Sequence, residues 1–597
     1  MERLLRTACW LLILVFPALA MAQTRATGKV TDENGQPLPG VTVTQVNTNI
    51  STLTDGAGNF SLSLSSGSKT LSFSHVGYQT QRADYTVAAM VVRMQKEENV
   101  LQDVVVLGYG TTQKSQLTAA VSSVKGSDLM KTQAVDLGNA LQGMASGVNV
   151  TAPTGAPGAD AVIRIRGIGS LNSNDPLFII DGIPVTNGLN TISPSDIESI
   201  EILKDASAAA IYGARASNGV VLVTTRSGKS GKSTISLDAS LGMASPTRLP
   251  KMISTGEYIQ LQNEAFANDG NSNKNNDNAS SLPNTDWLDA VFQNGLTQKY
   301  SLAFSGGNDK SRYYLAGNMI DQTGIITQSG FKRYGLRSNV SSDVKSWLKI
   351  GENLNLTYDA TKSIGASGDG GRPGSLPGIV RYALIRPNAI PIYDPATGLY
   401  SDLPPASLYA NPNLYGDGKN PLALAEYRNA EELRYRMVGN VFAEAKIING
   451  LKFRTDLGLD FFMREQQSYA GQIPGDRTTL TNLNKSVNKY RNRFSTLNWT
   501  NRFNYATTIN NLHSIGAVVG SEFVQYKADY FSGARNGYDD RSDNSGSLQY
   551  LSYGTGQQFT DGVLQEWALM SYFGRVTYAY DQKYLFTASM RSDASSR

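Results

Sequence analysis

The chain has 597 residues, with 54 Lys and Arg against 50 Asp and Glu, and a mean hydropathy of −0.27. This near balance of charge argues against a nucleic-acid partner, which would favour a basic patch. Outside the extreme N-terminus, no apolar run reaches the roughly 18 residues that a membrane-spanning helix needs. The 57 glycines and 29 tyrosines instead suit turns and strands of alternating polarity.

Residues 1–22 have the organisation of a secretory signal peptide. Arg3 and Arg6 form a basic region, Cys9–Leu19 is apolar, and Ala20–Ala22 is a small-residue cleavage site. Cleavage would remove Cys9, the only cysteine. The mature chain is therefore expected to have no disulfide, no thiolate metal site and no lipid-carrying cysteine.

Residues 23–96 alternate strand-like runs with turn signals, which predicts a small β-sandwich. The expected strands are Gly28–Thr31, Val41–Val46, Asn59–Leu64 and Lys69–Ser74. The pattern G-x-V-T-D-x-x-G-x-P-L-P-G-V, which begins at Gly28, resembles the carboxypeptidase regulatory-like domain. The expected role is a folded adaptor without peptidase chemistry.

Residues 97–110 form a linker with an extended segment. Val104, Val105 and Val106 are strongly strand-prone, and Gly108 and Gly110 loosen the chain that follows. Composition alone predicts an edge strand between two domains.

Residues 111–230 are predicted to form a compact α+β domain. Asp136 can cap a helix whose apolar positions Leu137, Ala140, Leu141 and Met144 have helical spacing, and Gly147 suits its end. A second short helix is expected at Ala206–Tyr212. Strands are expected at Val148–Val150, Ala161–Arg166, Leu177–Ile180, Ser199–Leu203 and Val220–Thr225.

Residues 231–597 contain about eleven alternating segments, many of them around ten residues long, which is typical of transmembrane β-strands. In Leu348–Asp359, for example, apolar side chains such as Ile350 and Leu354 share one face, whereas Asn355 and Asp359 share the other. A soluble β-sandwich is the alternative interpretation.

Four motifs in order resemble the SusC-like (SusC/RagA family) TonB-dependent outer-membrane transporters. They are Asp103–Val106 with the following Gly-Tyr-Gly, Ile163–Gly167, Ile179–Val185 and Asp196–Gly219. The resemblance covers nearly the whole mature chain. It departs at Leu141–Gly147, which lacks the arginine often found after L-Q-G, and at Gln102-Asp103, where the family more often has Asp-Glu.

The resemblance implies a mainly β fold, with a carboxypeptidase-regulatory-like sandwich, an α+β plug domain and the first part of a 22-stranded transmembrane barrel. About eleven strands cannot close a barrel of that size, and open sheet edges are not viable in lipid. The sequence is therefore expected to be the N-terminal portion of a longer protein.

The resemblance also implies TonB-dependent import of an oligosaccharide or short peptide across the outer membrane. The implied partners are TonB with its inner-membrane energising complex, a SusD-like lipoprotein lid and outer-membrane lipid. An extended segment can add as a strand to a partner's sheet, so a TonB-box role is expected for Asp103, Val104, Val105, Val106, Gly108, Tyr109 and Gly110. A siderophore or cobalamin receptor and a non-transporting adhesin barrel are the alternatives.

Arg164 and Arg166 lie on one face of a predicted strand and would need acidic partners inside a barrel lumen. We expect an electrostatic lock between plug and barrel, in which Glu201, Lys204 and Asp205 take part; stability within the plug is the alternative. The remaining plug-motif residues are Gly167, Asp181, Gly182, Tyr212 and Gly213. The glycines are expected to serve turns.

Enzyme chemistry, a cofactor and a metal site are not predicted. The only histidines, His75 and His513, lie far apart in the sequence, and no cysteine remains for zinc. The G-K-S triplets of residues 228–233 lack the glycine of a phosphate-binding loop. The long loop Ser363–Glu432 has several tyrosines, for which direct ligand contact is not expected. The loops Asn268–Asn278 and Asp539–Asn544 could bind calcium through oxygen ligands, but neither matches the spaced calcium-loop motif, so a solvated loop is expected.

Overall fold

The computed structural model describes residues 25–597 apart from short internal stretches. These are 47, 49, 66–68, 76–77, 79, 86–89, 96–103, 108–109, 114–118, 172, 187–188, 190–191, 273, 365–377, 402–408, 410–411, 417–418, 472–484, 511 and 540–545. The expected signal peptide and charged linker, with Asp103, Gly108 and Tyr109 of the TonB-box segment, lie outside the described residues. The chain divides into two compact units, residues 1–103 and 104–597.

The first unit is a small β-sandwich of two sheets, β4-β1-β7 and β3-β2-β5-β6. Phe60 and Phe73, one from each sheet, meet edge to face at 5.4 Å in its core. Its strands are β1 (Arg25–Thr31), β2 (Thr42–Gln45), β3 (Ser51–Leu53), β4 (Asn59–Ser63), β5 (Thr70–Ser74), β6 (Gln81–Asp84) and β7 (Met90–Arg93).

The second unit begins with a β-hairpin. Strand β8 (Val104–Leu107) pairs antiparallel with β9 (Gly110–Gln113), in a register that places Leu107 opposite Gly110. Among the described residues, β8 pairs with no other strand. The valine segment is therefore already paired along one edge and leaves the other edge for a further strand.

An α+β domain follows the hairpin. Its sheet has the order β10-β15-β16-β13-β14, and β11 pairs separately with β12. The elements are β10 (Val121–Lys125), α2 (Gly126–Lys131), α3 (Leu137–Ala140), β11 (Val148–Thr151), β12 (Val162–Ile165), β13 (Leu177–Ile180), β14 (Ile183–Val185), η3 (Pro194–Asp196), β15 (Ile197–Leu203), α4 (Ala206–Ala209), η4 (Ala210–Tyr212), η5 (Ala214–Ala216) and β16 (Val220–Thr225).

The predicted cap at Asp136 is present, because its carboxylate accepts a 2.9 Å hydrogen bond from the backbone N–H of Asn139. The helix is shorter than the apolar spacing predicts and ends at Ala140. Turns at Gly143 and Gly147, with φ of 75° and 72°, then carry the chain into β11. These positive φ values are where glycine costs least.

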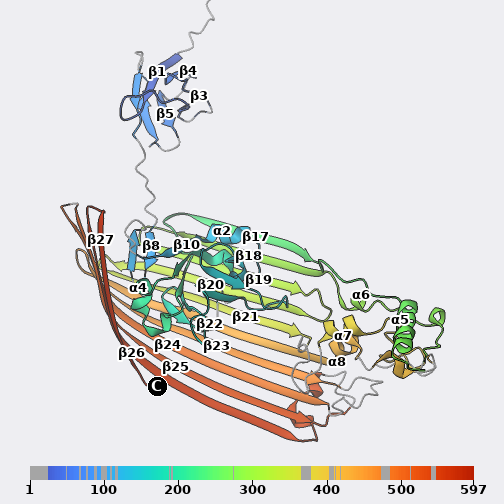
Figure 1. Ribbon diagram of the computed structural model, residues 1–597. Coiled ribbons are helices and arrows are strands. Elements are labelled where there is room, and N and C mark those ends of the chain that lie inside the picture. The colour runs from blue at the N-terminus through green and yellow to red at the C-terminus, as the bar shows by residue number, and fades with distance from the viewer. Residues whose placement is uncertain are drawn as a thin grey trace, which may run out of the picture. The chain divides into compact units, whose positions relative to one another are not determined.

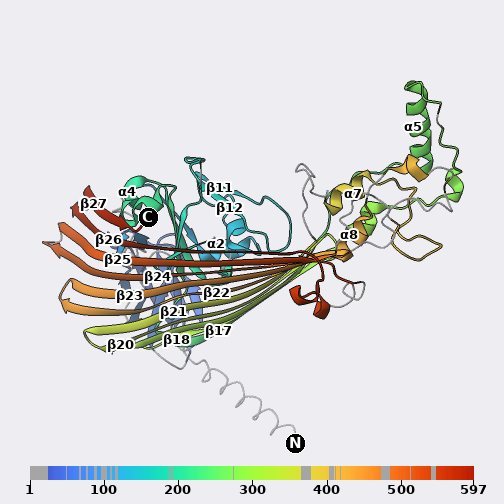
Figure 2. The ribbon, with the colours of Figure 1, turned by 90° about the horizontal axis from the view of Figure 1, so that it is seen from below.

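Eleven long strands, each antiparallel to its neighbours in the sequence, form one curved sheet. The α+β domain lies on one face, inside the curve (Figures 1 and 2). The strands are β17 (Gly231–Ala244), β18 (Gly295–Gly307), β19 (Ser311–Thr323), β20 (Gly330–Lys345), β21 (Leu348–Ser363), β22 (Arg428–Ile448), β23 (Leu451–Ala470), β24 (Ser486–Ile509), β25 (His513–Asn536), β26 (Gln558–Tyr580) and β27 (Tyr584–Ser595).

These strands have 12 to 24 residues, longer than the roughly ten predicted. Their alternation is polar inward and apolar outward. On β21, Asn355 and Asp359 are buried toward the α+β domain, whereas Ile350 is 45% exposed. This is the pattern of a membrane barrel and the reverse of a soluble sandwich. The mainly β fold class is confirmed.

No helix among the described residues is long and apolar enough to cross a membrane.

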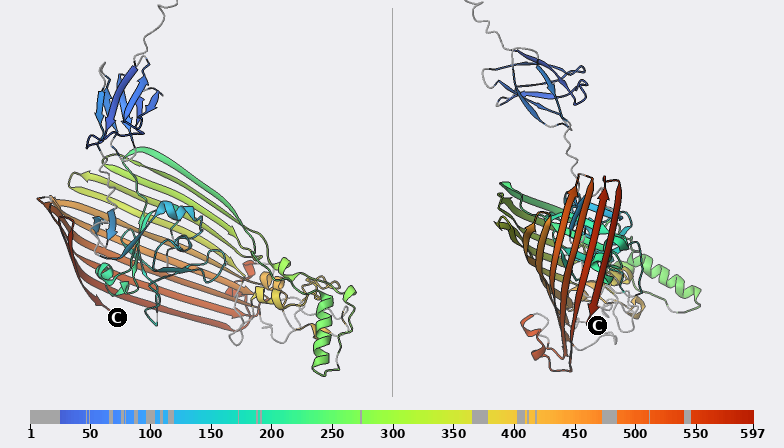
Figure 3. Two further views of the ribbon diagram at one scale, coloured as in Figure 1. Left: turned by 45° about the horizontal axis from the view of Figure 1, so that its top comes forward. Right: turned by 90° about the vertical axis from the view of Figure 1, so that its left-hand side faces the viewer.

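The two ends of the large sheet differ. Short turns, such as 346–347 and 449–450, join strands at one end, which we call the turn side. At the other end, the loop side, long loops carry helices that pack together (Figure 3). These are α5 (Thr255–Asn268), η6 (Ala279–Ser281), α6 (Trp287–Val291), α7 (Ile379–Ile385), η7 (Pro412–Tyr415) and α8 (Pro421–Tyr427), with η9 (Gly546–Leu548) and η10 (Leu551–Tyr553) in a further loop.

Candidate functional site: the domain boundary and its two cavities

The two motif arginines pair inside the α+β domain. Arg164 of β12 forms a 2.6 Å ion pair with Asp175, and Arg166, which has a φ of 56°, forms one of the same length with Asp205. None of the ion pairs of these two arginines reaches the large sheet in the described part of the chain. These contacts correspond to the alternative of stability within the domain, not to the expected lock between the domain and the sheet.

Lys204 and Asp205 tie the same region together. The Nζ of Lys204 donates to Ser122 Oγ at 2.7 Å and to the Ser146 carbonyl at 2.9 Å. Asp205 accepts a 2.8 Å hydrogen bond from the Ala120 N–H. That backbone hydrogen bond, followed by the Arg166 guanidinium, holds the pKa of Asp205 below its usual value.

Asp181 and Gly182 form the tight turn between β13 and β14. Their φ values are 48° and 88°, as a two-residue hairpin of this kind requires. The turn also positions the Asp181 carboxylate for contacts with Thr225 and with the large sheet. The carboxylate accepts from the N–H and hydroxyl of Thr225 and pairs with Arg337 of β20, which is 1% exposed in its side chain. This is a direct link between the domain and the sheet.

Asp196 makes a second link. Its carboxylate, fully buried, accepts from the Tyr314 hydroxyl at 2.9 Å and from the Asn318 amide at 3.2 Å, both of β19. Burial raises the pKa of Asp196 against the lowering effect of the Tyr314 hydroxyl and of the Arg337 and Arg226 guanidinium groups.

Arg436 of β22 makes a third link. Its guanidinium pairs with Asp460 at 3.0 Å and donates to the Thr186 carbonyl at 2.6 Å, while Thr186 N–H donates to Asp460 at 2.9 Å. The two members of this buried ion pair of the sheet therefore each form one hydrogen bond with the α+β domain: Arg436 donates to it and Asp460 accepts from it.

The segment around Tyr212 and Gly213 contacts the last strands of the sheet. Arg591 of β27 donates to the Ile211 carbonyl at 2.8 Å and pairs with Glu522 of β25 at 2.6 Å. At Gly213, with φ of 74°, a Cβ would lie 2.3 Å from a carboxylate oxygen of Asp593. Glycine is needed here for both its conformation and its size.

Among the acids of the plug motif in the described residues, Glu201 alone forms no ion pair, whereas Asp181 and Asp205 each pair with an arginine. The side chain of Glu201 is buried on β15, and Oε2 has no hydrogen-bond partner among the described residues. Burial raises the pKa of Glu201.

A cavity of about 550 Å³ lies between the α+β domain and the sheet on the loop side. Phe462 of β23 and Trp567 of β26 supply aromatic surface to its wall. The charged side chains that line it are Arg215, Arg333, Arg434, Arg436, Arg464, Asp160, Asp175 and Asp359. The arginines are held by carboxylates; Arg333 and Asp359, for instance, form two 2.7 Å hydrogen bonds.

An aromatic row crosses four neighbouring strands at this level. Phe462 stacks on Phe494 at 4.8 Å, Phe494 on Tyr526 at 6.1 Å, and Tyr526 on Trp567 at 5.2 Å. The sequence did not predict this row. The alternation of polar and apolar residues shows on which face of a strand a ring lies, but not which rings of neighbouring strands are in contact.

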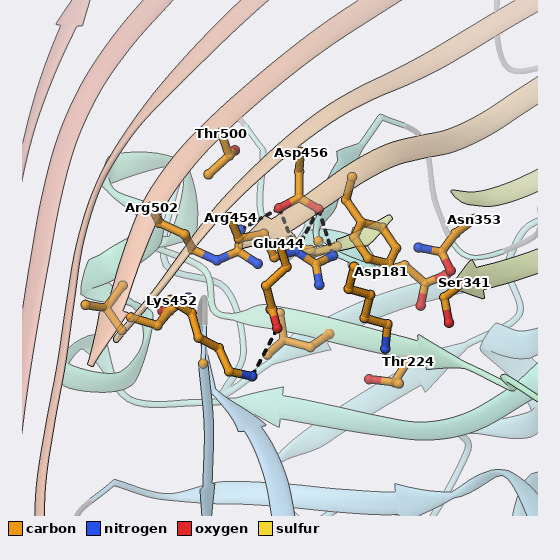
Figure 4. A pocket seen from close by; sticks show the side chains of 18 of the residues that line it. Asp181, Thr224, Ser341, Asn353, Glu444, Lys452, Arg454, Asp456, Thr500 and Arg502 are labelled. Carbon is orange, nitrogen blue, oxygen red and sulfur yellow. Dashed lines mark hydrogen bonds and ion pairs between the residues drawn. The ribbon is translucent and has the colours of Figure 1, made fainter. Parts of the chain in front are cut away.

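A second cavity, of about 610 Å³, lies on the turn side of the domain and reaches Gly110 of β9. Figure 4 shows Lys452 directed toward Glu444, and Asp456 between Arg454 and Arg502. The distances of these ion pairs are 3.0 Å for the first and 2.8 Å for each of the other two.

The loop tyrosines are largely structural. Tyr382, Tyr409 and Tyr415 are buried in the helical cluster of the loop side, around Trp287. Asn275 is 3% exposed and hydrogen-bonds Tyr415 at 3.0 Å, so the asparagine-rich loop is not simply solvated as expected.

The two histidines have aromatic partners. His75 meets Tyr78 edge to face, and His513 Nδ1 lies 2.8 Å from the Tyr578 hydroxyl. Within the described residues, no three His, Cys, Asp or Glu side chains gather as metal ligands.

An extended hairpin, a compact domain seated against long antiparallel strands and cavities on both sides of that domain define the class of plugged outer-membrane receptors. Comparison with family models agrees. Residues 26–107 match the CarboxypepD_reg-like domain, and residues 113–220 match the TonB-dependent Receptor Plug Domain. We therefore refer to the α+β domain as the plug.

Individual relatives place the chain more closely. It is 32% identical to the TonB-dependent receptor P3 of Formosa agariphila, over 99% of this chain and 57% of the relative, and 31% identical to the TonB-dependent receptor SusC of Bacteroides thetaiotaomicron, over 96% and 57%. The structure of the RagAB peptide importer in its open-open state matches with 28% identity and a TM-score of 0.70, over 83% of this chain and 56% of that chain.

Over nearly its whole length the chain thus matches SusC-like TonB-dependent receptors, as the sequence motifs predict. The chain spans a little more than half the length of the curated relatives that it matches.

Proposed function

We propose that the protein to which this chain belongs imports a nutrient across the outer membrane, with energy from TonB, and acts together with a SusD-like lipoprotein lid. The observation that supports this most is the order of parts. A strand-forming segment, β8, immediately precedes a plug that lies between two cavities. A partner that pulls on β8 would act on the plug directly.

The partner interaction is strand addition. TonB would pair with Val104–Val106 through backbone hydrogen bonds, which do not require particular side chains. Because β9 already occupies one edge of β8, TonB would either add to the other edge or displace β9.

For the substrate we propose an oligosaccharide or a short peptide, held on the loop side. Aromatic rings with arginines beside them suit both, since rings stack on sugar or side-chain faces and guanidinium groups bind carboxylates. The related RagAB structure is described as a peptide importer, whereas SusC stands among relatives described only as receptors.

Two proline variants of the full-length receptor test the proposal. Val105→Pro removes a backbone N–H from the strand offered to TonB, whereas Thr112→Pro, opposite it in the register, weakens the pairing of β9 with β8 and leaves every backbone N–H of β8 in place. We expect Val105→Pro to abolish both binding of a purified TonB C-terminal domain and growth on the substrate, with normal amounts of receptor in the outer membrane. We expect Thr112→Pro to leave TonB binding equal or stronger. Equal binding and growth in both variants and the wild type would refute energised import.

The alternatives make different predictions. An adhesin barrel would bind its ligand and support attachment with β8 deleted. A siderophore or cobalamin receptor would support growth only when iron or cobalamin is limiting. Growth on single glycans or peptides as the carbon source therefore separates the three functions.

A further inference from the structure

The turn-side cavity has an excess of positive charge. Six basic and three acidic side chains line it: Arg312, Lys349, Lys452, Arg454, Arg502 and Arg575 against Asp181, Glu444 and Asp456. All three acids are occupied. Asp181 pairs with Arg337, Glu444 with Lys452, and Asp456 with both Arg454 and Arg502.

Arg575 of β26 is the unusual member of this set. It is only 6% exposed, yet no carboxylate in the described part of the chain lies within ion-pair distance of its guanidinium. Its Nη2 lies beside the backbone of Gly110, where a Cβ would be 3.3 Å away, and the plug's Tyr212 shares the same wall. A buried charge without a partner is costly, and a charged group of this kind in a cavity marks a candidate binding site.

The cavity wall carries further donors. Thr577 lies two residues along the same strand as Arg575, Thr500 of β24 brings another hydroxyl group, and Lys349 brings a cation on β21, five strands away from β26. Guanidinium groups bind planar and tetrahedral oxyanions through paired N–H groups. The volume of about 610 Å³ accommodates more than a single small ion.

We propose that the turn-side cavity is an oxyanion-binding site with Arg575 as its anchor, and that its ligand is a carboxylate, sulfate or phosphate group. The group is supplied either by a free anion or by an acidic imported ligand on its way past the plug. The site does not depend on TonB, so it can be tested apart from import.

The test uses the full-length receptor, purified in detergent, and isothermal titration calorimetry in a low-salt buffer. The probes for a free anion are sodium sulfate and sodium phosphate. The probes for an acidic ligand are trigalacturonate and triglutamate, with maltotriose as the neutral control. We expect at least one anionic probe to bind and maltotriose not to compete with it.

Four variants locate the binding. Arg575→Gln is expected to weaken it at least tenfold, and Arg575→Lys less. Arg493→Gln, which removes the same charge from a half-exposed arginine of β24 that pairs with Asp529 of β25, is the matched control and should bind as the wild type does. Thr577→Glu supplies a carboxylate to the cavity and should abolish anion binding in a protein at least as heat-stable as the wild type.

The outcomes are decisive in either direction. Binding of sulfate or phosphate that is lost in Arg575→Gln supports a free-anion site, and binding of the acidic oligomers alone supports a ligand group. If Arg575→Gln does not fold, loss of binding in folded Thr577→Glu supports the site. Binding that is equal in Arg575→Gln and Arg493→Gln, or in Thr577→Glu and the wild type, overturns the proposal, as does failure of every anionic probe to bind the wild type.

Discussion

The hydroxyl of Tyr314 donates a 2.9 Å hydrogen bond to the buried carboxylate of Asp196 and so joins the large sheet to the plug. The two residues are 118 positions apart in the sequence. Such cross-links, and not the arginines of the I-R-I-R-G motif, seat the plug in the described part of the chain.

Removing the Tyr314 hydroxyl should weaken the attachment of the plug to the sheet and lower the stability of the receptor. We expect Tyr314→Phe to lower stability by about 1–3 kcal/mol, because the buried carboxylate loses a donor. The measurement is the midpoint of heat unfolding of the full-length receptor in detergent. Tyr334→Phe, on an exposed ring of β20, is the control and should unfold at the wild-type midpoint. Equal midpoints for both variants would contradict the role of this hydrogen bond.

The pair of Arg337 and Asp181 should matter more. Arg337→Met leaves a nearly buried carboxylate without its cation, which typically costs about 3–5 kcal/mol. Adding Asp181→Asn to that variant should restore part of the loss. Lys332→Gln breaks a neighbouring ion pair that is more exposed, where the expected cost is about 0–1 kcal/mol. Heat unfolding ranks the three variants, and an equal loss for Lys332→Gln and Arg337→Met would argue against a special role for the buried pair.

Glu201 should make the receptor less stable as pH rises. Burial raises the pKa of Glu201, so its contribution to stability is greatest below the unfolded pKa of about 4.3 and is lost as pH rises through the higher folded value. Glu201→Gln keeps the shape without the charge. We expect it to raise the unfolding midpoint at pH 8 more than at pH 4, with a gain of about 1–3 kcal/mol at pH 8. A gain that is the same at both values of pH would show that the charge of Glu201 is not the cause.

Gly213 should tolerate no side chain. Its backbone conformation is one that only glycine adopts readily, at a cost of about 1–3 kcal/mol for other residues, and a Cβ would also displace Asp593 and Arg591. Gly213→Ala should therefore cost more than Gly143→Ala, where φ is also positive but no atom lies within 4 Å of the added Cβ. The difference between their unfolding midpoints measures the cost of the steric contact between the added Cβ and β27. Equal midpoints would show that Asp593 and Arg591 move aside without a loss of stability.

The helical cluster of the loop side should depend on Trp287. The ring is fully buried, its N–H donates to the Pro387 carbonyl at 3.1 Å, and the Arg386 guanidinium lies 4.9 Å above it. Trp287→Ala should cost the cluster about 3–5 kcal/mol and expose the helices α7 and α8 to limited proteolysis. Trp347→Ala, on a half-exposed ring in a turn, should leave the digestion pattern unchanged. Resistance of the Trp287 variant would show that the cluster does not rely on this side chain.

The sequence by itself determined the local elements and the family. Alternation marked the eleven strands and their inward faces, Asp136 marked a helix start, and Gly182 marked a turn, because each of these depends on residues a few positions apart. The motifs in order then named the class of receptor.

Only the tertiary structure decided which inward residues meet. Arg164 and Arg166 pair with acids inside the plug, whereas Arg337 of β20 pairs with Asp181 across the boundary between the sheet and the plug. Arg575 was left with a cavity instead of a carboxylate. The physical reason is that a two-residue period assigns a side chain to a face, whereas its partner on that face depends on strand register and on how the plug packs against it.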